Sequence, residues 1–412
     1  MNNLEVKIFG KSVGALGTYK NKTYFEYHPD FKQYNLEISP IKLPLDYVGA
    51  YINTDDRYFN DLAGVFADSL PDKFGNEIIN AYYRKKGFNQ YQLTNIQKLA
   101  YIGSSGMGAL EYIPSIQTDA IKEVLEIKHL VEESRLILQG KIETTIPEIM
   151  EAGGSAGGAR AKAIIQWNQK TNDIISGRLK PKDGYEHYII KFDGTAKHQK
   201  SEDYQKIEYI YMKIASMCGL NVADVKLLHE RDYTHLLVKR FDRVQNTKLH
   251  MHSLCGMTHT NFNLSGAYSY ENYLKTVEIV THKFDSIIRA YSHMIFNIIS
   301  SNQDDHTKNF SFLMDDLGEW DISPIYDLTY SHGQGYTANH QMSINAKTNN
   351  FTLDDLIQVA QSVDINISDA KLIIKHIQTI FYDNFEKMAK ELDIDKDHIQ
   401  RILKYTRRFD IT

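Results

Sequence analysis

The segment from Asn302 to Asp327 restricts the possible folds of this 412-residue chain more than any other stretch. Asp304 is followed five positions later by Asn309, and Asp327 comes eighteen residues after Asn309. This order is typical of kinase-type phosphoryl transfer, in which one carboxylate orients the attacking hydroxyl and the other two side chains hold Mg²⁺. The spacing therefore predicts Asp304 as the catalytic residue and Asn309 and Asp327 as metal ligands. Asp and Asn also satisfy the backbone in ordinary turns, so the triplet alone leaves that alternative open.

Composition limits the class of protein and the environment in which it works. Hydrophobic residues make up 42% and charged residues 24%, as in an ordinary globular protein, and the net charge is −5. A chain with this balance is not expected to bind nucleic acid or a membrane surface over its whole length. It has no apolar leader and no apolar run long enough to span a membrane. Two distant cysteines, Cys218 and Cys255, indicate a reducing compartment, so we expect a cytoplasmic protein without membrane partners.

Strand patterns dominate the first half of the chain and helix patterns the second. Alternating apolar residues predict antiparallel strands over 4–27, whereas helical spacing is clear over 203–217 and from residue 284 onward. Residues 310–322 interrupt the helices with a predicted hairpin. We therefore predict an α+β fold in three parts: a β-rich N-terminal subdomain, a lobe with a glycine-rich loop and a helical lobe with the catalytic loop. The expected boundaries are 1–115, 116–245 and 246–412.

Three features of the middle part fit a nucleotide site. Glycines at 153, 154, 157 and 158 would let backbone N–H groups approach phosphate oxygens, although the loop is not a Walker A motif. Lys191 ends an apolar strand after this loop, where a kinase needs a lysine to reach the α- and β-phosphates. Glu208 on the next helix could pair with it. A flexible turn, a solvent-facing lysine and an exposed glutamate are the alternatives for these features.

Further candidates lie where the lobes would join and around the acidic triplet. The strand that ends at Lys239, Arg240 and Phe241 would meet adenine through its backbone, or Phe241 could be a core residue. His306 could face a phosphate, and Lys308 could neutralise one or lie in solvent.

At these residues the chain resembles the HipA family of toxin–antitoxin serine/threonine kinases. The similarity is collinear and extends over nearly the whole sequence. The segments that carry it are Val13–Gly17, Phe66–Asp72, Gly103–Leu110, Gly154–Lys162, Ile189–Lys191, Val238–Arg243, Asn302–Phe312 and Pro324–Asp327. The resemblance implies a bilobal protein-kinase-like (HipA-like) fold, with a small β-rich N-terminal subdomain and an all-helical C-lobe.

The resemblance also implies residue roles. Asp304 matches the catalytic base, Asn309 and Asp327 match the Mg²⁺ ligands, and Ser155 matches a serine whose autophosphorylation inactivates the kinase. The segments expected to bind ATP comprise Ser155, Ala156, Gly157, Gly158, Ala159, Arg160, Ala161, Lys162, Lys191, Lys239, Arg240, Phe241, His306, Lys308, Asn309, Tyr326 and Asp327.

The implied biological role is that of the toxin of a type II toxin–antitoxin module. Its implied partner is a HipB-like helix-turn-helix antitoxin, through which alone it would contact DNA. The implied substrate is a protein, an aminoacyl-tRNA synthetase. Two alternatives stay open: a small-molecule or lipid kinase with the same acidic site, and a catalytically weak co-repressor scaffold for the antitoxin.

Overall fold

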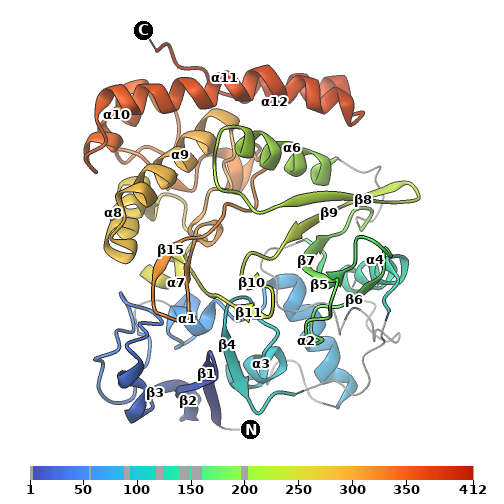
Figure 1. The fold of residues 1–412 in the computed structure, drawn as a ribbon, viewed down its shortest axis with the longest axis vertical. Helices are drawn as coiled ribbons and strands as arrows, with labels where there is room; N and C mark the ends of the chain where they lie inside the picture. The colour runs from blue at the N-terminus through green and yellow to red at the C-terminus, as the bar shows by residue number, and fades with distance from the viewer. Residues whose placement is uncertain are drawn as a thin grey trace.

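The structure is a computed structural model that describes residues 3–54, 57–87, 93–116, 124–139, 149, 160–195 and 203–411. Figure 1 shows the N-terminal strands at one end of the long axis and the last helices at the other, with a second sheet between them. Strands come first and helices last, as the sequence predicts. The α+β class is therefore confirmed.

A four-stranded antiparallel sheet with the order β3-β2-β1-β4 forms the N-terminal part. Its strands are β1 (Asn3–Ile8), β2 (Lys11–Tyr19), β3 (Lys22–Tyr27) and β4 (Leu110–Ile113). Leu4, Val6 and Ile8 are buried because alternate side chains of a strand point to the same face. The accompanying helices are η1 (Pro29–Tyr34), η2 (Arg57–Phe59), α1 (Gly64–Ala67), α2 (Lys73–Lys85) and α3 (Asn95–Ile102).

The middle of the chain forms a five-stranded antiparallel sheet with the order β6-β5-β7-β9-β8. Its strands are β5 (Lys162–Trp167), β6 (Ile174–Ser176), β7 (Glu186–Lys191), β8 (Val225–Glu230) and β9 (Tyr233–Lys239). Helices α4 (Ile127–Leu138) and α6 (Tyr204–Met217) lie beside this sheet (Figure 1). The helix predicted over 203–217 is confirmed, and Gly219 follows its end with φ +79°, a conformation that glycine adopts readily.

The C-terminal part contains most of the longer helices. They are α7 (Leu254–Thr258), α8 (Tyr270–Thr281), α9 (Phe284–Ser300), α10 (Leu353–Gln361), α11 (Ile367–Glu391) and α12 (Lys396–Tyr405), with the 3₁₀ helices η4 (Thr307–Asn309) and η5 (Gly335–Ala338). The helical spacing from residue 284 onward and the three helices at the end of the chain agree with the sequence.

Strands also occur in this helical lobe, so its description as all-helical was too simple. The predicted hairpin is confirmed as β14 (Ser311–Met314) and β15 (Trp320–Ile322). The lobe also contains β11 (Thr247–Lys248), β12 (His250–Ser253), β13 (Tyr268–Ser269) and β16 (Met342–Ser343), and β11 pairs with β10 (Arg243–Val244) just before it. Strand β12 pairs with β14, and this pairing satisfies backbone groups of the segment that enters the lobe.

The hydrophobic core joins the N-terminal part to both lobes. One cluster of buried side chains extends from Leu4 in β1 through α6, α9 and α11 to Ile402 in α12. A second cluster joins Phe74 of α2 to Ile165 of β5 and Ile190 of β7. The predicted domain boundaries stay a prediction, but packing is continuous across them.

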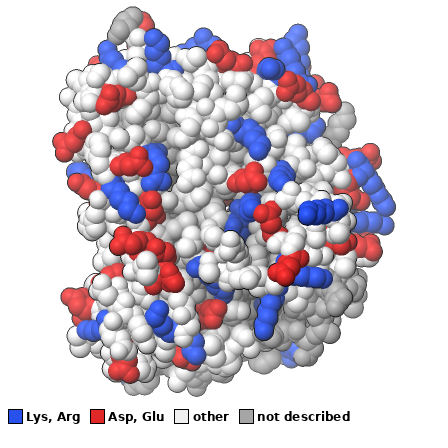
Figure 2. Space-filling view, viewed as in Figure 1, with Lys and Arg blue, Asp and Glu red and all other residues white. Residues whose placement is uncertain are grey.

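Charges of both signs are mixed over the face seen in Figure 2. This mixture agrees with the net charge of −5. That face has no broad basic surface of the kind that follows a nucleic-acid backbone. None of the described helices is long and apolar enough to cross a membrane.

Candidate active site

Lys191 stands at the centre of the candidate site. It ends β7, and its Nζ donates a hydrogen bond to Oε1 of Glu208 on α6 at 2.5 Å. The same Nζ also contacts Oδ1 of Asp327. The predicted pairing of Lys191 with Glu208 is therefore present. Burial alone would lower the pKa of Lys191, but the two carboxylates raise it above its usual value, so the lysine carries a positive charge.

Asp327 adopts an unusual backbone conformation. Its φ of 55° lies in the left-handed region, which Asp and Asn adopt more readily than most residues other than glycine. Burial favours the protonated carboxyl, but the nearby ammonium groups of Lys191 and Lys162 outweigh it and lower the pKa of Asp327. Asp327 is thus held as a carboxylate beside two lysines.

The loop between α9 and β14 presents the other two members of the acidic triplet. Nδ2 of Asn309 donates to the backbone oxygen of Asp304 at 2.9 Å, which fixes the short turn between them. The neighbouring Asp305 is buried and accepts hydrogen bonds from the Tyr270 hydroxyl at 2.7 Å and the Gln341 N–H at 2.6 Å. Asp305 anchors the loop, a role that we did not predict from the sequence. Asp304 remains available for chemistry.

Asp304 has the properties of a general base. Its side chain is 40% exposed, whereas that of Asp305 is inaccessible. Partial loss of water and the negative charges of Asp327 and Asp305 raise the pKa of Asp304 to about 7. A base works best when its pKa lies near the working pH, because it is then both unprotonated and able to hold a proton.

His306 lies next to Asp304 and differs from the nearby lysines in carrying no charge. Its Nε2 is 3.7 Å from Oδ1 of Asp304, and its ring packs against Phe262 at 4.8 Å between centroids. Burial lowers the pKa of His306 to about 4, so the ring is neutral at neutral pH. The predicted contact of His306 with a phosphate stays a prediction, and it would be made by a neutral ring.

Two further lysines from the predicted ATP-binding set contact the N-terminal part of the chain. Nζ of Lys162 lies 3.5 Å from Oδ2 of Asp72. Nζ of Lys308 lies 5.7 Å from the ring centre of Tyr58 and 5.3 Å from that of Phe262. Both cations are thus placed by residues outside the acidic triplet.

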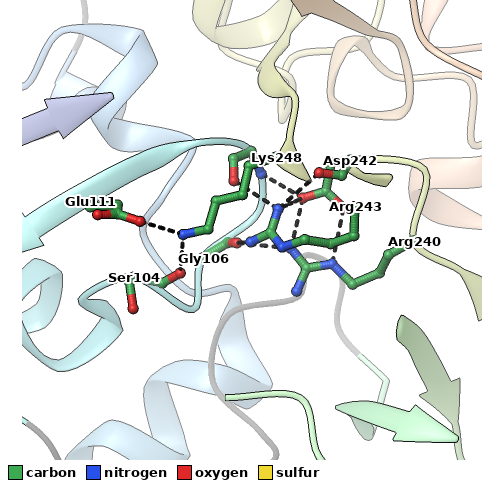
Figure 3. A network of polar contacts seen from close by, with 8 residues as sticks. Ser104, Gly106, Glu111, Arg240, Asp242, Arg243 and Lys248 are labelled. Atoms are coloured by element: carbon green, nitrogen blue, oxygen red, sulfur yellow. Dashed lines mark hydrogen bonds and ion pairs between the residues drawn. The ribbon is translucent and has the colours of Figure 1, made fainter. Parts of the chain in front are cut away.

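The segment that joins the lobes is fixed by a buried ionic network, shown in Figure 3. The guanidinium of Arg240 is 1% exposed and donates two hydrogen bonds to Asp242, at 2.7 and 3.0 Å. Arg243 contacts the same carboxylate at 2.7 Å, and both arginines donate to the backbone oxygen of Gly106. The N–H of Gly108 also donates to Asp242 at 2.7 Å. The Arg240 side chain is held in this network, and its backbone N–H donates to the His187 oxygen at 2.9 Å, which leaves its backbone oxygen for the predicted nucleotide contact.

The other two residues predicted at the junction of the lobes, Lys239 and Phe241, contact residues outside this network. Nζ of Lys239 contacts Oε1 of Glu186. The ring of Phe241 lies 5.7 Å from that of Tyr326, whose hydroxyl donates to the backbone oxygen of Lys308 at 2.8 Å. The Phe241–Tyr326 pair therefore connects the junction of the lobes to the loop that carries Asp304 and Asn309.

The glycine-rich loop lies largely outside the described residues. Ser155, Ala156, Gly157, Gly158 and Ala159 belong to that part, so their predicted contacts stay predictions. Of the two residues that follow, Arg160 places its guanidinium 3.9 Å from the ring centre of Tyr204, and Ala161 is buried.

The donor atoms present are compatible with Mg²⁺. Among the described residues, no group of three or more His, Cys, Asp or Glu side chains could hold a metal ion by itself. Mg²⁺ is commonly bound by one or two protein oxygens together with phosphate oxygens and water, and Asp327 with Asn309 offers that kind of donor set. The role of these two residues as metal ligands stays a prediction.

Comparisons with known proteins agree with this architecture. The family model of the HipA N-terminal domain matches residues 4–113, and that of the HipA-like C-terminal domain matches residues 154–407. The serine/threonine-protein kinase toxin HipA of Shewanella oneidensis is 25% identical over 358 residues, which cover 79% of this chain and 74% of that protein. A shorter match, 27% identical over 150 residues, covers 34% of this chain and 33% of Y4mE, a candidate kinase of Sinorhizobium fredii.

The fold can be compared with a solved structure. HipA in the complex of Shewanella oneidensis HipA, HipB and operator DNA superposes with a TM-score of 0.66 at 17% identity, over 98% of this chain and 94% of that one. This likeness confirms the predicted HipA-like kinase fold. The C-terminal family model alone spans more than half of the 412 residues. The chain therefore belongs to the HipA family.

Proposed function

We propose that the chain is an ATP- and Mg²⁺-dependent serine/threonine protein kinase that acts as the toxin of a type II toxin–antitoxin module. The observation that carries this proposal is the convergence of Lys191 with Glu208 and Asp327, beside a loop that presents Asp304. A kinase requires the ion pair between its strand lysine and helix glutamate, together with a metal-binding aspartate at the same site. The proposal does not depend on any single motif.

The residues divide the work of phosphoryl transfer. Lys191 and Lys162 would neutralise phosphate charge, while the backbone near Phe241, where the lobes join, would hold adenine. Asp304 accepts the proton of the substrate hydroxyl as its oxygen bonds to the γ-phosphorus and the bond from that phosphorus to the β-bridging oxygen breaks. Asn309 and Asp327 would hold Mg²⁺, which when bound neutralises charge on the phosphates.

Two further roles belong to this proposal. Autophosphorylation of Ser155 would add roughly −1.5 to −2 charges beside the ATP phosphates and switch the enzyme off. A HipB-like helix-turn-helix antitoxin would be the partner and would carry the DNA affinity of the complex. A protein substrate of the aminoacyl-tRNA synthetase class would explain toxicity, because its phosphorylation would stop tRNA charging.

The catalytic part is tested by Asp304→Asn in the full-length protein. Loss of the general base should reduce kcat for phosphate transfer from radiolabelled Mg-ATP by roughly 100- to 10,000-fold. Asp316→Asn, on an exposed turn of the same lobe, is the matched control and should keep full activity. Unchanged transfer in the Asp304 variant would refute the assigned base.

Growth arrest and mass spectrometry separate the alternatives. Expression of the wild-type chain should arrest growth, and Asp304→Asn should remove the arrest. Equal arrest by both proteins would reject the kinase toxin, because the arrest would then not depend on phosphoryl transfer. After incubation with Mg-ATP, phosphate on Ser155 supports the protein kinase, whereas turnover of ATP only in the presence of a lipid or small-molecule extract would favour the other kinase class.

A further inference from the structure

Two lysines of the candidate site face each other across neighbouring strands. Lys162 begins β5 and Lys191 ends β7, and they are directly opposite each other in the antiparallel register. Side chains in such a pair lie on the same face of the sheet, and like charges in that position destabilise it. Both side chains are also largely removed from water. Each ammonium therefore needs a negative partner to keep its place.

The two lysines obtain those partners from different parts of the chain. Lys191 has Glu208 and Asp327 from the kinase lobes. Lys162 has Asp72, whose Oδ2 is 3.5 Å from its Nζ, and the two side chains are only 6% and 11% exposed. Asp72 belongs to the N-terminal part, far from the catalytic loop in sequence. One carboxylate near the site thus comes from outside both lobes.

Asp72 is held firmly in its position. It is the N-cap of α2, and its Oδ1 accepts a hydrogen bond from the Gly75 N–H at 2.8 Å. Phe74 in the first turn of α2 belongs to the same buried cluster as Ile165 of β5 and Ile190 of β7. Since one carboxylate oxygen caps the helix and the helix packs on the sheet, the other oxygen is fixed toward Lys162.

We propose that Asp72 is a positioning residue that holds the Lys162 ammonium where it meets the nucleotide phosphates. This inference rests on the proposed phosphoryl transfer, because it assigns Lys162 to the phosphates. The N-terminal part of the chain would then contribute to nucleotide binding through Asp72, in addition to its role in packing.

The test uses the full-length protein and the variants Asp72→Asn, Lys162→Gln and their combination. Asn is as good an N-cap as Asp, so Asp72→Asn keeps the hydrogen bond from Gly75 while it removes the charge that faces Lys162. Asp395→Asn is the matched control, because Asp395 caps α12 in the same way through the Asp397 N–H at 2.9 Å. Steady-state kinetics with Mg-ATP and thermal unfolding are measured for every protein.

Asp72→Asn should raise KM for Mg-ATP by roughly tenfold or more with little change in kcat, the size expected for a lost charged partner of a ligand-binding group. Lys162→Gln should raise KM at least as much, and the double variant should match it, because Asp72 acts only through Lys162. Asp395→Asn should leave KM unchanged. A purely structural role for Asp72 would lower the melting temperature without changing KM.

The outcomes separate this inference from the proposed function. If the wild-type protein transfers phosphate but Asp72→Asn keeps the wild-type KM, or its effect adds fully to that of Lys162→Gln, the positioning role is overturned and the kinase stands. If the wild-type protein neither binds nor turns over Mg-ATP, the proposed function fails and this inference fails with it.

Discussion

The carboxylate of Glu208 accepts a hydrogen bond from the Lys191 ammonium, which also contacts Asp327. With Glu208 in place, Lys191 is drawn toward both α6 and Asp327. In Glu208→Gln, Lys191 keeps the charge of Asp327 but loses that of Glu208. The lysine should then move toward Asp327, which is a proposed metal ligand. We expect kcat/KM for Mg-ATP to fall by roughly 10- to 100-fold, in line with about 1.5–3 kcal/mol for a charged hydrogen bond.

The matched control for this change is Glu278→Gln, on the exposed face of α8. It also removes one negative charge but should leave the kinetics unchanged. A Glu208→Gln enzyme with wild-type kcat/KM would show that the Lys191–Glu208 pair has no part in the reaction.

Residue roles differ in how far the sequence could predict them. Lys191 and Glu208 were predictable because a strand end and the following helix carry them at recognisable spacing. Asp72 and Asp305 were not, since their partners Lys162 and Tyr270 lie 90 and 35 positions away. No local pattern encodes a contact of that kind.

At the scale of elements, α11 supports the helix that carries Glu208. The ring of Phe381 in α11 lies 5.6 Å from that of Tyr211 in α6 and is fully buried. Phe381→Ala should lower the free energy of unfolding by about 3–5 kcal/mol, since it leaves a cavity under α6. Leu372→Ala on the same helix, where the side chain is 64% exposed, should change it by less than about 0.5 kcal/mol. Urea denaturation compares them, and similar losses would contradict this account.

Elements with a clear apolar period were predicted well, and those without one were missed. Helices α6 and α9 and the β14–β15 hairpin follow from apolar spacing and turn residues. Strand β12 reads His-Met-His-Ser, so it shows no apolar alternation, yet it is largely buried. Its histidines are accommodated by tertiary partners: Nε2 of His250 lies 2.9 Å from the Ile38 oxygen, and Nδ1 of His252 lies 2.7 Å from Asp68.

For the whole molecule, buried histidines predict sensitivity to mild acid. Burial lowers the pKa of His187, His235 and His250 to about 4 and that of His293 to about 3. In the unfolded chain these histidines take up protons near pH 6.5, whereas in the folded chain they stay neutral until the pH falls to about 4. Stability is therefore fully present above pH 6.5 and should fall as the pH decreases toward 4. Melting temperatures between pH 8 and 4 measure this loss.

His187→Leu isolates the histidine contribution. Neither ring nitrogen of His187 has a hydrogen-bond partner among the described residues, so the substitution removes no such bond. The melting temperature of the variant should therefore fall less steeply between pH 6.5 and 4 than that of the wild type. His376→Gln, at an exposed position of α11, should keep the wild-type profile. The raised pKa values of Glu208 and Asp72 act in the opposite direction and are common to all three proteins. A His187→Leu profile parallel to that of the wild type would contradict the assignment.

The continuous core also has a consequence for biosynthesis. Because α6 packs against α11 and both belong to one buried cluster, α6 cannot complete its packing until α11 has left the ribosome. At about 5–20 residues per second, translation of this chain takes roughly 20–80 s. For most of that time the nascent chain lacks α11, the helix that supports α6 and its residue Glu208. Under the proposed function, a growing polypeptide would therefore lack a complete site until its synthesis is nearly finished, which would give the proposed antitoxin time to accumulate.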